Sequence, residues 1–128
     1  MGRIPSAKVG GTAAPSQKVT GMALTRDARL TTVERAERDP SFAKALLDEA
    51  VTLFLNGEAD TARLVLRDLV DATVGFDALG AAMAKPVKST QRMLSKDGNP
   101  SMDNLAAILE IVRKRLGVEI HAHAVAAE

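Results

Sequence analysis

The chain has 128 residues, a formal net charge of +1, 46% hydrophobic residues and no cysteine. Such a length supports one domain with a modest core, and the abundance of Leu, Ala and Val favours packed helices. The lack of cysteine excludes a disulfide framework, a thiolate metal site and a cysteine nucleophile, and no apolar run is long enough to span a bilayer.

Residues 1–21 are rich in Gly, Ala, Ser, Thr and Pro and show no apolar periodicity. We expect this segment to be a disordered basic tail, because it has too few large apolar residues to offset the entropy of ordering. It lacks the apolar core of a signal peptide, which predicts a cytoplasmic protein. Met22 opens a sequence that looks like a natural protein start.

Three helices are predicted next along the chain. The first, Thr25–Arg38, is weakly amphipathic, and Asp39-Pro40 marks the boundary to the second, since Asp can cap a helix that Pro begins. A strong apolar stripe covers Phe42–Leu55, and Asn56-Gly57 ends it with residues that tolerate left-handed dihedrals. The third helix, Asp60–Thr73, has a broad apolar face, so we expect it to be central to the core.

Two short helical segments joined by a tight turn follow. The first, Phe76–Ala84, has apolar residues at helical spacing, and Ala81 and Ala82 are small enough to admit a neighbouring backbone. Lys85-Pro86 is the predicted turn, because the residue before Pro avoids helical dihedrals and Pro starts a helix well. The second helix, Val87–Leu94, is basic and rich in hydroxyl groups. This arrangement is typical of a helix-turn-helix.

The remainder of the chain predicts a loop, a helix and a strand. In the loop Ser95–Pro100, Gly98 and Asn99 are available for positive φ. A regular apolar stripe predicts a helix over Met102–Leu116, after which Val118–Val125 alternates apolar and polar residues as strands do. A single strand has no partner of its own, so we expect it to pair with a second subunit or with another protein's sheet.

Positive charge gathers around the second helix of the helix-turn-helix. Four cations lie within residues 82–99 against the single acid Asp97, whereas residues 22–81 carry seven basic and eleven acidic side chains. Such asymmetry steers a protein towards phosphate, and in a helix-turn-helix the second helix enters the major groove of DNA. We therefore predict a DNA-binding surface made of Lys85, Lys88, Ser89, Gln91, Arg92 and Lys96. A solvated polar helix face is the alternative interpretation of these residues.

Several segments resemble bacterial addiction-module antitoxins of the HigA-like class. They are DPSFAKALLDEA at 39–50, LFLNGE at 53–58, TARLVLRDLV at 61–70 and SKDGNPSMDNL at 95–105, and residues 76–117 resemble the Xre/Cro type of helix-turn-helix domain. Many such domains carry Glu near the end of the recognition helix, where this chain has Leu94, so here packing must hold that helix. The resemblance implies a homodimer that binds operator DNA, represses its own operon and neutralises a RelE/ParE-like toxin.

The combined prediction is an all-α fold, a helix-turn-helix bundle of about five to six helices with a short C-terminal β-strand. We assign 1–21 to the tail, 22–74 to a helical toxin-binding or dimerisation region, 75–117 to the DNA-binding domain and 118–128 to the terminal strand and tail. The N-terminal tail is either a dispensable extension or a basic arm that contacts DNA.

Two alternatives to an antitoxin stay open: a stand-alone helix-turn-helix regulator without a toxin, and a protein-interaction module that has lost DNA binding. An enzyme is not expected, because the carboxylates are scattered over helix faces and no glycine loop for phosphate is present. His121 and His123 share one face of the predicted strand, but with no further His or Cys we expect them to face solvent. We therefore predict no metal, no cofactor and no membrane partner.

Overall fold

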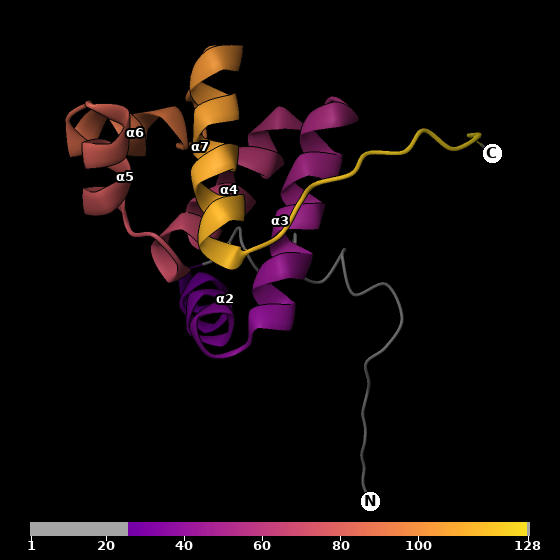
Figure 1. The fold of residues 1–128 in the computed structure, drawn as a ribbon, viewed down its shortest axis with the longest axis horizontal. Helices are drawn as coiled ribbons and strands as arrows, with labels where there is room; N and C mark the ends of the chain where they lie inside the picture. Colours follow the sequence, from indigo (N-terminus) through magenta and orange to yellow (C-terminus); the bar gives the residue numbers. More distant parts are fainter. Residues whose placement is uncertain (1–25, 128) are drawn as a thin grey trace, which may run out of the picture.

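The computed structural model describes residues 26–127, and the regular secondary structure of that range is entirely helical (Figure 1). The expected tail at 1–21 and the Thr25 cap lie outside the described residues. Six helices follow one another within the described range: α2 (Arg26–Arg38), α3 (Pro40–Leu55), α4 (Ala59–Ala72), α5 (Phe76–Met83), α6 (Val87–Met93) and α7 (Met102–Leu116). No helix within the described range has the length and apolarity needed to cross a membrane.

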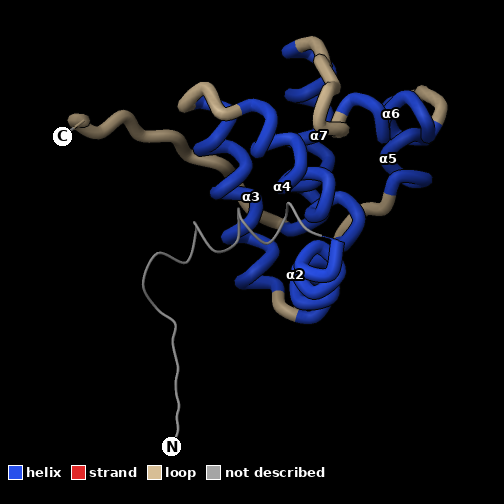
Figure 2. Tube along the Cα trace, turned by 180° about the vertical axis from the view of Figure 1, so that it is seen from behind, coloured by secondary structure: helices blue, strands red, loops and turns tan. Residues whose placement is uncertain are grey.

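Helix α4 is the centre of the core, as the breadth of its apolar face predicted. It contacts α2, α3 and α5, while α7 closes the bundle against α3 and α5 (Figures 1 and 2). One continuous apolar cluster joins all of these helices, and its fully buried members include Leu66 and Leu69 of α4, Leu79 of α5 and Ile108 and Val112 of α7. Helix α5, and α6 packed against it, therefore rest on the same core as the upstream helices.

The predicted helix ends are formed by the residues that the sequence indicated. The Asp39 carboxylate accepts hydrogen bonds from the backbone N–H groups of Ser41 and Phe42, at 3.0 and 3.3 Å, and so caps α3. Gly57 follows α3 with φ +86°, and Gly117 ends α7 in the left-handed conformation with φ +69°. These local devices fix the lengths of α3 and α7 independently of the core.

Two charged side chains of α4 are buried together with its apolar face. Arg63 is 7% exposed and Asp68 is 1% exposed, so both are core residues rather than surface ones. Asp68 forms an ion pair with Arg29 of α2, whose Nε lies 2.6 Å from Asp68 Oδ1, and the same guanidinium contacts Asp71. These contacts join α2 to α4, and the Arg29 guanidinium offsets only part of the cost of burying the Asp68 charge.

The C-terminal strand is absent from the described chain. After Gly117 the segment Val118–Ala127 forms neither strand nor helix and runs outward past α3 (Figure 1). Among the described residues, the backbone of this segment is bonded to the rest of the chain only at its root, where Val118 N–H donates to the Arg113 carbonyl at 3.0 Å. The alternating pattern predicted a strand, but a strand needs a neighbour to complete its hydrogen bonds.

Candidate nucleic-acid interface

The turn between α5 and α6 brings two helices unusually close together. A Cβ atom added to Gly80 would lie 2.9 Å from the Lys85 carbonyl oxygen and 3.5 Å from Val87 Cγ2. The backbone N–H of Lys85 also donates to the Gly80 carbonyl at 2.9 Å. Gly80 is therefore the residue that admits the neighbouring backbone, which corrects the prediction of that role for Ala81 and Ala82, both of which are exposed.

Ala84 makes the turn itself. It ends α5 with φ +55° and ψ +45°, and it is the single non-glycine residue with positive φ among residues 26–127. Left-handed dihedrals cost an L-residue with a Cβ roughly 1–2 kcal/mol. The sequence indicated a turn at Lys85-Pro86, and the structure shows that Ala84 reverses the chain while Pro86 precedes the first residue of α6 in an extended conformation.

Helix α6 turns one polar face outward. Lys88, Gln91 and Arg92 are exposed, and their spacing of three and four residues places them on one side of the helix. Thr90 is fully buried beneath them and donates its hydroxyl proton to the Val87 carbonyl at 2.7 Å. Ser89 is only half exposed, so its predicted outward position is met in part.

The two remaining predicted residues flank this helix. Lys85 is half-buried in the turn before α6, and Lys96 is exposed in the loop after it. Leu94 follows α6 and is fully buried. Packing therefore holds the end of this helix, at the position where many Xre/Cro-type domains carry Glu. The structure thus brings the predicted residues to one end of the bundle, along α6 and the two segments next to it (Figure 1).

The cations of this surface are not used inside the fold. Among the described residues, no ion pair involves Lys85, Lys88, Arg92 or Lys96. Their charges remain available to a polyanion, with Asp97 as the acidic side chain in the same loop. A surface of exposed basic and amide groups on a short helix suits phosphate contacts and base edges together.

Arg63 of α4 positions the end of this surface, and the sequence analysis did not identify it. Its Nε donates to the Ser95 carbonyl at 3.0 Å, and its Nη2 donates to the Lys96 carbonyl at 2.7 Å and to Asp60 Oδ1 at 2.7 Å. The two bonds to backbone carbonyls reach across more than thirty residues of sequence, whereas the Asp60 bond is local. The Asp60–Arg63 spacing of three residues was a visible signal for an ion pair, but nothing local indicated the two carbonyl acceptors.

Gly98 holds the loop against α6. A Cβ there would lie 2.4 Å from the carbonyl oxygens of both Arg92 and Met93, which no real side chain can do without movement. Gly98 and Asn99 were available for positive φ, and neither adopts it. Glycine is required here by close backbone approach rather than by dihedral freedom.

Comparisons with protein-family models, curated proteins and solved structures found no match to this chain. The class of the site therefore rests on its own geometry: two short helices meet at a tight turn, and the second carries exposed basic side chains that form no ion pair with the rest of the described chain.

Proposed function

We propose that this protein is a DNA-binding transcriptional regulator that acts as a homodimer and represses the operon that encodes it. The observation that carries the proposal is the exposed face of α6, where Lys88, Gln91 and Arg92 lie together and neither Lys88 nor Arg92 has an ion pair within residues 26–127. Arg92 has the donors to hold guanine bidentately, and Gln91 has the donor and acceptor that match adenine. Lys88 and Lys96 supply phosphate contacts.

A titration of the duplex upstream of the gene, at several salt concentrations and with an unrelated duplex as control, tests this proposal. We expect selective, salt-dependent binding. Arg92→Ala should cost roughly 1–3 kcal/mol and relax one base position, whereas Lys96→Ala should weaken binding to all sequences and reduce the salt slope by about 1. Arg115→Ala is the matched control, because Arg115 is an exposed cation in the last turn of α7, at the end of that helix farther along the chain from α6.

Equal and weak binding to both duplexes would overturn the proposal and favour the protein-interaction module. A dimeric regulator also predicts two half-sites separated by about one helical turn of DNA or a multiple of it. Hydroxyl-radical footprinting would reveal that spacing, and a single protected half-site would contradict the dimer.

The antitoxin role is the finer part of the proposal, and the resemblance of the upstream segments to HigA-like antitoxins supports it. The exposed charged side chains of α2 and α3 are of both signs, the acids being Glu34, Glu37 and Asp48 and the cations Arg35, Arg38 and Lys44. The acids of this mixed surface can pair with a basic partner. The implied partner is a RelE/ParE-like toxin encoded by the neighbouring gene.

Co-expression with the product of a short, basic neighbouring reading frame tests this role. We expect the chain to relieve growth arrest and to co-purify with that product. The double charge reversal Glu34→Lys and Glu37→Lys should weaken the complex without affecting operator binding, while Glu110→Lys on α7 serves as the control. Operator binding without any toxic neighbour would instead identify a stand-alone regulator.

A further inference from the structure

The last ten described residues form an extension that the bundle does not use. Val118 and Ile120 pack against the core, whereas all residues from His121 to Ala127 are exposed, including Val125 at 86%. In Figure 1 this segment leaves the end of α7, crosses α3 and projects beyond the helices. Beyond its root at Val118, no backbone bond of the segment to the rest of the described chain is present.

The segment has two chemically different faces. Val118, Ile120, Ala122 and Ala124 occupy alternate positions, and the first two face the core, so this side of the segment faces the bundle. Glu119, His121 and His123 occupy the intervening positions and are exposed, with His121 Nε2 3.2 Å from Glu119 Oε1. An extended segment with one apolar and one polar face is suited to pairing with another strand over a helical surface.

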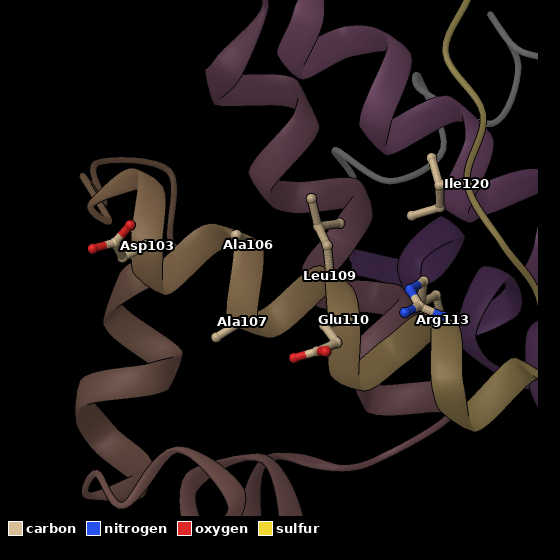
Figure 3. Close-up of a pocket in the computed structure, with 7 residues that line it drawn as sticks. All are labelled: Asp103, Ala106, Ala107, Leu109, Glu110, Arg113 and Ile120. Carbon is tan, nitrogen blue, oxygen red and sulfur yellow. The ribbon is translucent and has the colours of Figure 1, made fainter.

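Two shallow hollows lie beside Ile120 and leave room for a second strand. One, the α7 hollow, is lined by Ile120 and by residues of α7 that include Ala106, Ala107 and Leu109 (Figure 3). The other, the α3 hollow, lies between residues 120–124 and α3, where Leu55 is 66% exposed. A neighbouring strand with small side chains would cover apolar surface in both.

We propose that Val118–Val125 pairs with the same segment of a second copy of this chain, as an antiparallel two-stranded ribbon centred on His121. This inference deepens the dimer of the proposed function. In an antiparallel pair, directly opposed residues point to the same face of the ribbon. If the twofold axis passes through a residue, each apolar residue of one copy therefore lies opposite an apolar position of the other copy. A centre between residues would oppose apolar and polar side chains.

The length of the pairing and the charged groups together select the centre. With His121 at the twofold axis, residues 118–124 are paired, Glu119 lies opposite His123 of the partner subunit, and one contact sets His121 opposite the partner's His121. With Ala122 at the axis, His121 would face the partner's His123 twice, and Glu119 would face the partner's Val125. With Ile120 at the axis, Glu119 would face the partner's His121, but pairing would be limited to 118–122 because Gly117 ends α7. A carboxylate opposite an imidazole stabilises a strand pair, so the His121 centre gives the longest pairing that keeps such contacts.

The second copy is the occupant that this segment fits because the segment is complementary to itself in both polarity and charge. The pairing supplies the backbone partners that a single strand lacks and explains why the alternating sequence is not a strand within one chain. The small side chains at 122 and 124 then lie next to the partner's hollows rather than in solvent.

Single cysteines test the ribbon directly, because the chain has no cysteine of its own. Glu119→Cys, His121→Cys and His123→Cys place the thiol on the same exposed face, so each variant controls for the accessibility of the others. Directly opposed residues have Cα atoms about 4.5–5.5 Å apart, within the range of a disulfide. Identical cysteines at 119 or at 123 would be about 14 Å from their symmetry mates.

Under limiting oxidant and without DNA, we expect His121→Cys to form covalent dimer about tenfold faster than either of the other variants alone, because only its thiols meet the distance limit. A mixture of Glu119→Cys and His123→Cys should form the mixed dimer in preference to either homodimer. Equal, slow cross-linking of all three variants would show random collision and overturn the proposal, as would an absence of covalent dimer, the outcome expected if the segment pairs with another protein's sheet. Operator binding is measured separately, so a failure of the ribbon is distinguishable from a failure of DNA binding.

Discussion

The α2–α4 bundle and the α5–α6 pair use charged side chains in opposite ways. In the bundle, Arg29 binds Asp68 and Asp71 across the α2–α4 contact, and Arg63 binds Asp60 within α4. In the α5–α6 pair, Lys88 and Arg92 have no ion pair within the described chain, and close backbone packing at Gly80 and Gly98 holds the helices instead. In the α5–α6 pair, backbone contacts at glycine supply the rigidity that ion pairs supply in the bundle, so the cations of α6 are left unpaired within the described residues.

The largest expected effect comes from a substitution that disrupts the close glycine packing of the α5–α6 pair. Gly98→Ala places a Cβ 2.4 Å from two carbonyl oxygens at the end of α6, and we expect it to lower the free energy of unfolding by about 3 kcal/mol, at the upper end of overpacking costs. Chemical denaturation measures the loss. Gly57→Ala is the control for positive-φ strain without a clash, since nothing lies within 4 Å of a Cβ at Gly57. An equal loss in both variants would contradict the close-approach explanation.

The second prediction concerns pH and acts on the bundle alone. Burial, partly opposed by Arg29 and reinforced by Asp71, raises the pKa of Asp68 from 3.8 to about 7. Because the folded state holds this proton more tightly than the unfolded state, the resulting stability is present at low pH and is lost as pH rises towards and through 7. We expect the free energy of unfolding to fall by about 2–3 kcal/mol between pH 5 and pH 8.

Denaturation at the two pH values, with Asp68→Asn as the comparison, measures that contribution. The variant has no proton to lose at this position, so its stability should change less with pH than that of the natural chain. Asp77→Asn on the exposed first turn of α5 is the matched control and should retain the full dependence. The same pH dependence in Asp68→Asn would contradict the assignment.

The third prediction concerns Arg63, which connects α4 of the bundle to the loop that follows α6. Arg63→Ala removes three hydrogen bonds, including those to the Ser95 and Lys96 carbonyls, and we expect a loss of about 2 kcal/mol because these acceptors lie partly within reach of water. The loss of operator affinity should exceed the loss that the larger unfolded fraction of the variant accounts for, because the residues that follow α6 lose their hydrogen bonds to Arg63. Arg67→Ala, half-buried on the same helix, is the control. Equal operator affinity of folded Arg63→Ala would exclude a positioning role.

The smallest prediction is a gain in stability. Ala84→Gly relieves the left-handed dihedrals of the turn, and we expect it to raise the free energy of unfolding by about 1 kcal/mol. Ala81→Gly, exposed within the helical part of α5, should instead lower it by about 1 kcal/mol. Thermal denaturation of the pair gives the two signs, and a loss in both would show that Ala84 contributes more by its methyl group than its backbone costs.

The amino-acid sequence by itself determined the helices, their ends and the basic character of α6. Apolar periodicity and local caps such as Asp39, Gly57 and Gly117 act within a few residues, so they can be read along the chain. The sequence also indicated six residues for the predicted DNA-binding surface. Four of them are exposed in the structure, namely Lys88, Gln91, Arg92 and Lys96.

Only the tertiary structure decided which polar groups are buried and which glycines are indispensable. Arg63 and Asp68 read as surface residues of an amphipathic helix, and their burial depends on a loop and on a helix more than thirty residues away. Gly80 and Gly98 matter because another backbone passes within van der Waals range, which no local pattern records. The predicted terminal strand is absent from the described residues for the same reason. Period-two alternation is a local property, but a strand exists only where a second chain segment completes its hydrogen bonds.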